Sequence, residues 1–233
     1  MSQPVEPAGE PATETFTDQV VAVLGGTGPQ GRGLARRWAA AGVTVVLGSR
    51  SAARAAETAE ALSGASGGHI TGVGNREAAD QADIVVIAVP YDGHRDLLVD
   101  LAPTLAGKIV VDCVNPMGFD KQGAFPLQVP EGSAAQQASA LLPGSRVVAA
   151  FHHVSAVLLE DPAVESVSCD ILVLGDDRAA TEVVRGLADR IPGMRGVFAG
   201  RLRNAHQVEA LTCNLISVNR RYHAHAGLRI TDV

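Results

Sequence analysis

The sequence predicts an α/β fold: a doubly wound, mostly parallel sheet with helices on both faces and a small C-terminal α/β extension. Short apolar runs rich in β-branched residues alternate with alanine-rich runs along most of the 233 residues. This alternation is typical of parallel sheets that helices cover on both sides. Residues 83–89 are almost continuously apolar, as a strand buried on both faces requires. Hydrophobic residues make up 46% of the chain, which is enough for a sizeable core.

The expected elements follow from these runs and from the residues that begin and end helices. The expected strands are residues 20–24, 43–47, 69–73, 83–89, 108–113, 146–150, 170–174 and 196–198. The expected helices are residues 30–41, 52–62, 93–101, 133–141, 176–190 and 204–219. Gly42 is expected to end the first helix, while Ser51 and Ser133 are expected to cap the starts of two others. Pro103 is expected to follow the third helix, and residues 119–131 are predicted to be a loop because they contain a glycine and two prolines.

A glycine-rich turn follows the first expected strand and leads directly into the first expected helix. It reads Gly26-Thr27-Gly28-Pro29-Gln30-Gly31. In this context the helix N-terminus presents backbone N–H groups to a pyrophosphate, which raises the G-x-G-x-x-G pattern above an ordinary glycine turn. We therefore predict a Rossmann-type dinucleotide site in which Thr27, Gly28, Pro29 and Gln30 contact the pyrophosphate.

The end of the second strand indicates which dinucleotide binds. A site for NAD usually has an Asp or Glu about 20 residues after the glycines, where it binds the ribose hydroxyls. This chain has Ser49, Arg50 and Arg54 in that region instead. A carboxylate would repel a 2′-phosphate, whereas guanidinium groups attract it and can bind it bidentately. The three residues therefore favour NADP(H), although Arg50 taken alone could be an ordinary solvated arginine.

The carboxyl ends of three later strands supply further candidates, because ligands of such sheets lie at those ends. Val89 and Pro90 are expected beside the nicotinamide ribose, and Asn115 is expected to border the nicotinamide. His152 and His153 follow the strand at residues 146–150. One of these two histidines is a candidate contact for a second ligand, although a lone histidine is more often structural. No cluster of further ligands accompanies them, so we expect no metal site.

The C-terminal part of the chain is cationic, whereas the chain as a whole is acidic. Arg220, Arg221, His223, His225 and Arg229 lie close together in the sequence. One interpretation is a solvated helix end whose charges complement the helix dipole. The other is a binding patch for the anionic tail of a substrate.

Composition excludes several classes of protein. A formal net charge of −6 argues against a general nucleic-acid binder. Three widely spaced cysteines show no metal or redox spacing, and a reducing, cytoplasmic compartment fits them. No apolar stretch has the roughly 20 residues of a membrane helix. We expect a disordered tail over residues 1–17, an NADP-binding domain over 18–150, and a small substrate-binding and dimerisation region over 151–233.

The residues that are missing also narrow the chemistry. Tyr91 and Tyr222 are the two tyrosines, and neither lies in the Tyr-x-x-x-Lys pattern of reductases that use a tyrosine acid. Residues 153–233 are too few for the large helical domain that many dehydrogenases of small metabolites add. The second substrate must therefore be bound by little more than the nucleotide domain, which suits a flat redox partner stacked on nicotinamide.

Several segments together resemble the NADPH-dependent reductases of the deazaflavin coenzyme F420, and the actinobacterial members in particular. The segments are residues 23–31, Gly48-Ser49-Arg50, Ala88-Val89-Pro90, residues 148–152 and residues 211–231. The glycine segment alone is also similar to related folds, including the cytosolic domain of membrane metalloreductases. The Ser-Arg pair, the histidine segment and the C-terminal Asn-Arg-Arg-Tyr segment make the resemblance more specific.

This resemblance implies one chemical event, a reversible and direct hydride transfer between nicotinamide C4 and deazaflavin C5. It implies that Ser49, Arg50 and Arg54 bind the 2′-phosphate with Thr27 nearby. It also implies a nicotinamide site at Val89, Asn115 and Ala156, and a deazaflavin site near His152. The archaeal members carry a smaller polar residue at the position of His153. Because the deazaflavin tail is anionic, Arg220, Arg221 or Arg229 is expected to attract it.

Two other functions remain open from the sequence. One is an NADP-dependent reductase of a small imine or ketone, for which His152 would be the proton donor. The other is a non-catalytic NADP sensor. We further expect a homodimer, with the apolar helix over residues 210–218 at the interface or in the wall of the cleft.

Overall fold

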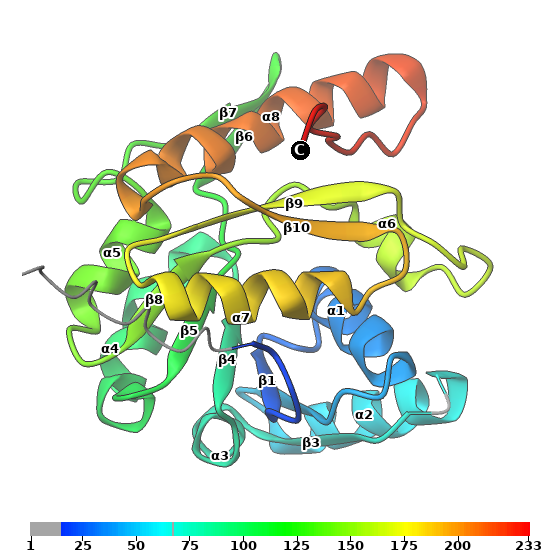
Figure 1. The fold of residues 1–233 in the computed structure, drawn as a ribbon, viewed down its shortest axis with the longest axis vertical. Helices are drawn as coiled ribbons and strands as arrows, with labels where there is room; N and C mark the ends of the chain where they lie inside the picture. The colour runs from blue at the N-terminus through cyan, green and yellow to red at the C-terminus, as the bar shows by residue number, and fades with distance from the viewer. Residues whose placement is uncertain (1–14, 67) are drawn as a thin grey trace, which may run out of the picture.

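The computed structural model describes residues 15–66 and 68–233, so most of the predicted N-terminal tail lies outside the described part of the chain. At its centre is a sheet in the order β10-β9-β8-β5-β4-β1-β2-β3 (Figure 1). The strands are β1 (Val21–Leu24), β2 (Val45–Ser49), β3 (Ile70–Gly74), β4 (Ile84–Ile87), β5 (Ile109–Asp112), β8 (Arg146–Ala149), β9 (Cys169–Gly175) and β10 (Met194–Phe198). Neighbouring strands are parallel except for the antiparallel pair β8 and β9. The predicted Rossmann-type, mostly parallel α/β fold with additional C-terminal elements is confirmed.

The helices connect the strands and cover both faces of the sheet. They are α1 (Pro29–Ala40), α2 (Ala52–Ser66), α3 (Asn75–Gln81), α4 (His94–Leu105), α5 (Ala134–Leu141), α6 (Ala156–Glu160), α7 (Arg178–Asp189) and α8 (Ala205–Tyr222). Gly42 has a positive φ of 81° after α1, and Ser133 accepts a hydrogen bond from the Gln136 N–H at the start of α5. Ser51 accepts one from the Arg54 N–H. These three predicted helix ends are therefore confirmed.

Strand order places a binding edge at the middle of the sheet. From β1 the chain moves outward to β2 and β3, and it then returns to add β4 on the other side of β1. Such a reversal opens a crevice at the carboxyl ends of the two strands. Strand β2 lies two residues later than expected, and this shift places Ser49 at its carboxyl end.

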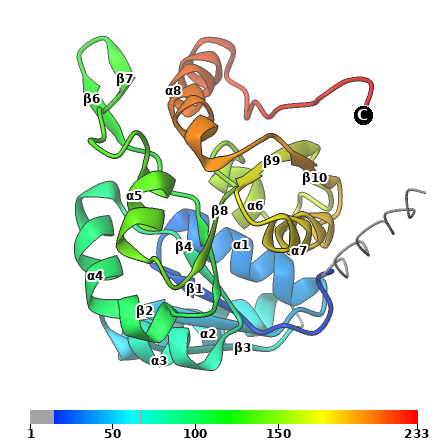
Figure 2. The ribbon, with the colours of Figure 1, turned by 60° about the vertical axis from the view of Figure 1, so that its left-hand side comes forward.

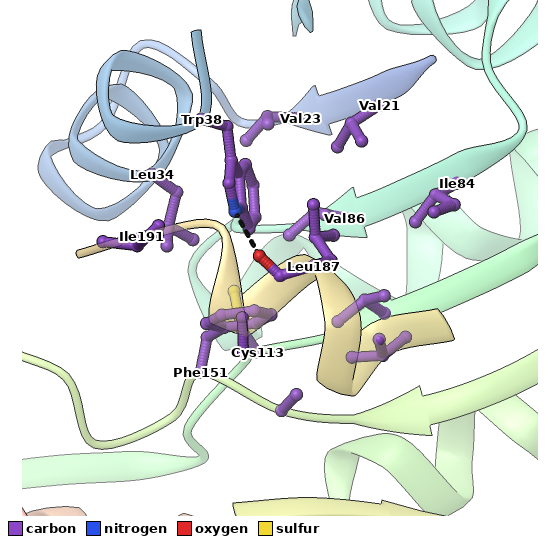
Figure 3. Packing of buried hydrophobic residues seen from close by; sticks show 14 of the residues in the cluster. Val21, Val23, Leu34, Trp38, Ile84, Val86, Cys113, Phe151, Leu187 and Ile191 are labelled. Carbon is purple, nitrogen blue, oxygen red and sulfur yellow. Dashed lines mark hydrogen bonds between the residues drawn. The ribbon is translucent and has the colours of Figure 1, made fainter. Parts of the chain in front are cut away.

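Alternate residues of the strands build two cores, one on each face. Val21 and Val23 face the core beneath α1 and α7, whereas Ala22 and Leu24 face the core beneath α3, α4 and α5. Trp38 of α1 packs edge-to-face on Phe151 with ring centroids 5.4 Å apart (Figure 3). Its indole N–H donates to the Leu187 carbonyl at 3.1 Å, so α1 is tied to α7 across the β4 side chains.

The prediction of a loop over residues 119–131 was wrong for its first half. Strands β6 (Met117–Asp120) and β7 (Gly123–Pro126) form an antiparallel hairpin. The Asp120 carboxylate accepts hydrogen bonds from the Gln122 and Gly123 N–H groups, and Gly123 has a φ of 124°. This Asp-x-x-Gly turn was a usable signal. In Figure 2 the hairpin projects from the sheet beside α8.

Two helices were missed, and α2 and α4 each extend beyond their predicted ends, to Ser66 and Leu105. Helices α3 and α6 have seven and five residues, too few to show a clear apolar period. Helix α4 continues through Pro103 to Leu105. Proline removes one N–H, which would have bonded the carbonyl of Val99. Val99 is 55% exposed, so water can bond to that carbonyl instead.

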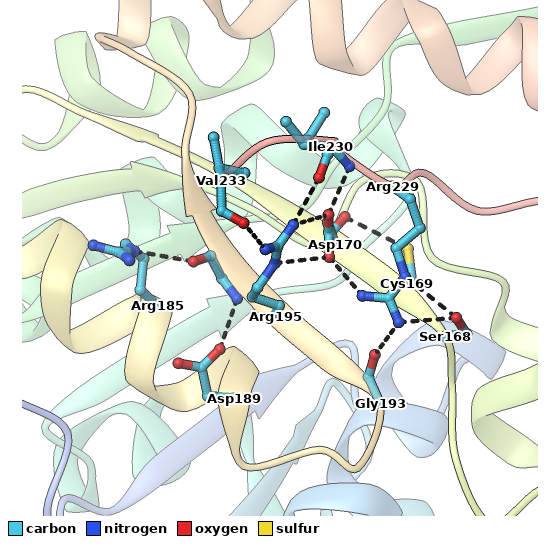
Figure 4. Close-up of polar contacts among 11 residues, drawn as sticks. Ser168, Cys169, Asp170, Arg185, Asp189, Gly193, Arg195, Arg229, Ile230 and Val233 are labelled. Atoms are coloured by element: carbon cyan, nitrogen blue, oxygen red, sulfur yellow. Dashed lines mark hydrogen bonds and ion pairs between the residues drawn. The ribbon is translucent and has the colours of Figure 1, made fainter.

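The segment after α8 returns to the sheet and packs along β9. Asp170, which is completely buried, accepts hydrogen bonds from the guanidinium groups of Arg195 and Arg229 and from the Ile230 N–H (Figure 4). These hydrogen bonds hold the pKa of Asp170 well below its usual range, and the bond from Arg195 has the largest effect. Burial of the carboxylate acts in the opposite direction. Arg229 also donates to Ser168 and to the Gly193 carbonyl. The buried carboxylate therefore fastens the C-terminal segment to the sheet.

Candidate functional site

The glycine turn lies where the strand order reverses and is packed too tightly for side chains. Gly25 has a φ of 77°, and a Cβ there would lie 2.5 Å from the Ala88 carbonyl oxygen and 2.8 Å from Val89 Cγ1. A Cβ on Gly31 would lie 2.7 Å from the Gly26 Cα. Helix α1 begins immediately after Gly28, and no side chain caps its first N–H groups. The turn therefore holds a helix N-terminus with N–H donors against the end of β4, as an anion cradle requires.

Cationic groups stand beside this cradle at the end of β2. Ser49 is 9% exposed, whereas Arg50 and Arg54 are exposed. In the described part of the chain, neither guanidinium group has a hydrogen-bond or ion-pair partner. Two arginines four residues apart in the chain, one before α2 and one in its first turn, have uncommitted donors that are suited to a phosphate monoester. The structure thus places the predicted 2′-phosphate residues together at one strand end.

The ends of β5 and β8 are joined by side chains from two directions. Asn115 Nδ2 donates to the His152 carbonyl oxygen at 2.8 Å. The hydroxyl of Thr212, on α8, lies 3.2 Å from the same oxygen and 3.4 Å from Asn115 Oδ1, and it donates to one of the two. Asn115 and His152, predicted as parts of the same site, therefore lie together. Thr212 was missed, because nothing in the sequence of α8 shows which residue faces β8.

The glycine turn and the end of β8 are also connected. Gln30 Nε2 donates to the Phe151 carbonyl oxygen at 3.0 Å. Phe151 is completely buried and has a φ of 64°, which is unusual for a residue other than glycine. Backbone strain of this kind is often found at functional sites. The side chain of Gln30 therefore helps to hold the turn that presents His152 and His153.

Both histidine rings are buried, at 3% and 4% exposure, and their ring nitrogens have no hydrogen-bond partner among the described residues. Burial lowers the pKa of His152 to about 4 and that of His153 to about 4. Both imidazoles are therefore neutral at pH 7. Buried polar atoms normally find partners, so four unpartnered ring nitrogens at one strand end of the described chain are unusual.

Helix α6 packs on α1 and places Ala156 at its first turn. A Cβ on Gly33 would lie 2.5 Å from Leu159 Cβ, so the two helices approach closely. Arg32 donates to the Thr27 carbonyl oxygen at 2.8 Å and pairs with Glu160 at 2.6 Å. The helix that carries Ala156 is thereby linked to the glycine turn. Pro90 is exposed and lies three residues after the end of β4, immediately before a short helical turn.

Arg220 and Arg221 line a cavity of about 560 Å³ between the end of α8 and the hairpin. Phe119, Gln122 and His223 also line it. Arg229 does not reach this cavity, because it is bonded to Asp170 and Ser168 on the other side of the C-terminal segment. The prediction that Arg220, Arg221 or Arg229 attracts the substrate tail stays a prediction, and Arg220 and Arg221 are the two of the three that line this cavity.

A second polar cluster, missed in the sequence, lies beneath the β5 end. His94 Nε2 lies 2.6 Å from Asp112 Oδ2, and both side chains are completely buried. Asp112 ends β5, so a polar residue at a strand end was the one available signal. Among the described residues no group of three His, Cys, Asp or Glu side chains could hold a metal ion. No helix in the described ranges is long and apolar enough to cross a membrane.

Comparison with known proteins agrees with this geometry. Residues 20–116 match the family model "NADP oxidoreductase coenzyme F420-dependent". An F420-dependent NADP reductase of Methanothermobacter thermautotrophicus is 38% identical over 221 residues, covering 91% of this chain and 95% of the relative. One from Methanocaldococcus jannaschii is 38% identical over 222 residues, with 91% and 98% covered. A crystal structure from Arthrobacter sp. FB24, described as a candidate F420-dependent NADP reductase, superposes with a TM-score of 0.78 at 25% identity, covering 91% of this chain and 98% of the other.

These relatives match almost their whole length, and the family model spans the glycine turn, the Ser-Arg pair and the strand ends after β4 and β5. The chain therefore belongs to the F420-dependent NADP reductase family.

Proposed function

We propose that NADP(H) and coenzyme F420 meet over the carboxyl ends of β1, β4, β5 and β8, and that hydride passes directly between nicotinamide C4 and deazaflavin C5. The protein is an F420-dependent NADP reductase, an oxidoreductase that transfers hydride between F420 and NADP. The observation that carries the placement is the glycine cradle beside two uncommitted arginines. The cradle is so close to the backbone that a Cβ would fill it, and the guanidinium groups beside it have no partner in the described structure. Both features fit a phosphorylated dinucleotide.

We assign the contacts from the positions of the strand ends. The N–H groups at Thr27, Gly28 and Gln30 bind the pyrophosphate, with Pro29 in the same turn. Ser49, Arg50 and Arg54 bind the 2′-phosphate. Val89 and Pro90 lie at the ribose, while Asn115 and Ala156 border the nicotinamide. His152 and His153 face the deazaflavin.

The chain contributes orientation rather than acid–base chemistry to this reaction. The two coenzymes supply the hydride donor and the hydride acceptor. Direct transfer needs the two reacting carbons held close and aligned, and it needs no general acid at the protein. His152 and His153 are buried and neutral, so they add no charge beneath the proposed site. Asn115 fixes the carbonyl that precedes His153, so the second ligand meets a rigid surface.

The alternative functions are less well supported. A reductase of a small imine or ketone would use His152 as its proton donor. Burial lowers the pKa of that group to about 4, so the imidazolium is absent at neutral pH. A non-catalytic sensor would bind NADPH and pass its hydride to no acceptor. Family membership favours the F420-dependent reaction over both.

The cavity beside Arg220 and Arg221 is suited to the anionic tail of the deazaflavin. Thr212, which bonds at the β8 end, precedes Arg220 by eight residues of α8, which is about 12 Å along a helix. Replacing Arg220 and Arg221 with Gln should raise the KM for coenzyme F420 and leave the KM for NADPH unchanged. Arg229→Gln is the control, because Arg229 is bonded to Asp170. An unchanged KM for F420 in the double variant would contradict the placement of the deazaflavin tail in this cavity.

The proposal also includes the oligomeric state, the location in the cell, the family subtype and the division of the chain into two parts. We infer a homodimer, because apolar side chains stay exposed on α8 and the hairpin, among them Val218, Tyr222 and Phe119. Three buried thiols support a cytoplasmic location. The actinobacterial subtype stays a proposal, because the curated relatives at 38% identity come from Methanothermobacter and Methanocaldococcus. The division into an NADP-binding part over residues 18–150 and a deazaflavin-binding part over 151–233 stays a proposal, because residues of both parts line the cavity at Arg220.

The decisive experiment mixes the purified protein with NADPH and oxidised coenzyme F420 and follows the absorbance band of the deazaflavin. Rapid bleaching, together with loss of NADPH absorbance in a 1:1 ratio, is the expected result. The same mixture with NADH should react far more slowly. Tight NADPH binding without bleaching would instead support the sensor.

A further inference from the structure

A buried polar chain runs beneath the proposed site and ends at the nicotinamide side of it. His94, the first residue of α4, lies 2.6 Å from Asp112 through Nε2 and 3.0 Å from Gln137 Oε1 through Nδ1. The other oxygen of Asp112 accepts the Val114 N–H at 3.0 Å. Val114 is followed by Asn115, whose side chain bonds the His152 carbonyl. The chain therefore links α4 and α5 to the turn after β5 and onward to the end of β8.

The hydrogen bonds also settle how many protons the pair holds. Gln137 Nε2 donates to the Glu131 carboxylate at 3.0 Å, so the oxygen of its amide faces His94. An amide oxygen only accepts, so Nδ1 of His94 carries a proton. The 2.6 Å contact between Nε2 and Asp112 Oδ2 needs a second proton between these two atoms. The pair therefore holds two protons, one on Nδ1 and one shared between Nε2 and Oδ2.

We propose that His94 and Asp112 are positioning residues for hydride transfer: they fix the turn from Cys113 to Asn115, and through Asn115 the backbone of His152, in the place where the two coenzymes meet. This inference rests on the proposed position of Asn115 at the nicotinamide. Neither residue touches a coenzyme. Both act through the Val114 N–H and the Asn115 amide, so loss of the pair changes alignment more than binding.

The pair should also make turnover depend on pH. Burial alone lowers the pKa of His94, but the hydrogen bond and charge of Asp112 and the bond to Gln137 outweigh it, so that the net pKa is raised. As pH rises through that value, one of the two protons is lost together with its hydrogen bond. The other charged groups around His94 are Glu131 before α5, Arg95 on α4 and Glu209 on α8, and the Tyr91 phenol is a further titratable group. Burial raises the pKa of Glu209 to about 7, so its titration must be separated from that of the pair.

Three variants test the inference with kcat, KM and melting temperature measured together. Asp112→Ala removes the bonds to both His94 and the Val114 N–H. It should lower kcat about tenfold or more, while the KM for NADPH changes less than about threefold. Leu105→Ala, in the buried last turn of the same helix, is the matched control: it should lower the melting temperature and leave kcat nearly unchanged. An unchanged kcat in Asp112→Ala would overturn the proposal.

Asp112→Asn keeps the proposal falsifiable even if Asp112→Ala does not fold. The amide side chain of this variant can accept the Val114 N–H and donate to a neutral His94, whose other nitrogen still donates to Gln137. Every bond therefore survives with one proton fewer. This variant should recover most of the lost kcat and should lack the alkaline decline of the wild type, while Glu209→Gln should retain that decline. The same alkaline decline in Asp112→Asn would overturn the proposal.

Asn115→Ala separates this inference from the proposed site. A fall in kcat in both Asn115→Ala and Asp112→Ala supports the route through Asn115. A fall in Asn115→Ala alone overturns the role of the pair and leaves the site intact. An unchanged kcat in Asn115→Ala overturns the placement of Asn115 at the nicotinamide, and with it the route by which the pair acts.

Discussion

At the scale of single residues, we propose that Arg50 selects NADP over NAD. Its guanidinium is exposed at the end of β2 and has no partner in the described residues. Arg50→Ala should weaken NADPH binding by about 1.5–3 kcal/mol, because a charge-assisted hydrogen bond is lost. Titration calorimetry or nicotinamide fluorescence measures this. NADH has no 2′-phosphate, so its affinity should change little.

A matched control for Arg50→Ala is Arg178→Ala. Arg178 is also an exposed arginine, but it lies on α7, away from the end of β2. Arg178→Ala changes the net charge of the protein by the same amount as Arg50→Ala. Any general electrostatic effect on an anionic ligand therefore appears in both variants. Equal losses for NADPH and NADH in Arg50→Ala would show that Arg50 does not bind the 2′-phosphate.

The glycine turn supports a second prediction at this scale. A methyl group on Gly31 would lie 2.7 Å from the Gly26 Cα and 2.9 Å from the Gly25 carbonyl oxygen. Gly31→Ala should therefore displace the turn and weaken NADPH binding about tenfold or more, because the N–H donors lose their alignment. Gly64→Ala is the control: its Cβ meets nothing within 4 Å, and removal of a helical glycine should stabilise the protein by about 0.5–1 kcal/mol. Wild-type affinity in Gly31→Ala would contradict the tight turn.

Residues of the dinucleotide cradle could be predicted because their partners lie nearby in the sequence. The glycines, Ser49 and Arg50 follow strands that their own apolar runs reveal. The His94–Asp112 pair could not be predicted, because its meaning depends on α4 and β5 lying side by side. The same holds for Arg229, whose partner Asp170 lies 59 residues earlier. The positive charge of Arg229 suggested a contact with the substrate. In the structure Arg229 instead bonds to the buried Asp170 carboxylate.

At the scale of elements, the packing of α6 on α1 depends on one buried arginine. Arg37 of α1 is 6% exposed and donates to the carbonyl oxygens of Leu158, Leu159, Asp161 and Val164. Arg37→Ala should lower the free energy of unfolding by about 3 kcal/mol or more, because buried carbonyls are left without donors. Arg36→Ala should cost less than about 1 kcal/mol, since Arg36 is more exposed and its two bonds are longer, at 3.3 Å. Urea denaturation of both variants compares them directly, and equal losses would contradict the prediction.

Elements with a strong period of their own were predictable, and short elements were not. The central strands are buried on both faces and read as continuous apolar runs. Helix α6 has five residues and is formed because Arg37 and Leu159 hold it against α1. The hairpin was missed because its glycine and proline were interpreted as loop residues, although the Asp120 turn requires that glycine. For α6, a contact with another segment outweighs the preference of the local sequence. For the hairpin, the geometry of the turn does so.

At the scale of the whole molecule, the dependence of stability on pH is set by groups that the fold buries around the site. His152 and His153 have pKa values lowered to about 4, below the value of about 6.5 expected in the unfolded chain. The unfolded state therefore binds more protons as pH falls from about 6.5 to 4, and stability is lost over that window. Each histidine contributes about 3 kcal/mol to this loss at most.

Glu209 acts in the opposite direction. Burial raises its pKa to about 7, so the folded state takes up a proton before the unfolded state does, and stability rises as pH falls from about 7 towards the unfolded value near 4.3. Chemical denaturation at pH 7 and pH 5 should show that replacing His152 and His153 with Asn makes the protein relatively more stable at pH 5. Glu209→Gln should make it relatively less stable at pH 5. The double histidine variant could instead lose as much stability between pH 7 and pH 5 as the wild type does. Water would then already hydrate both rings, and the proposal of neutral histidines at the deazaflavin site would have to be abandoned.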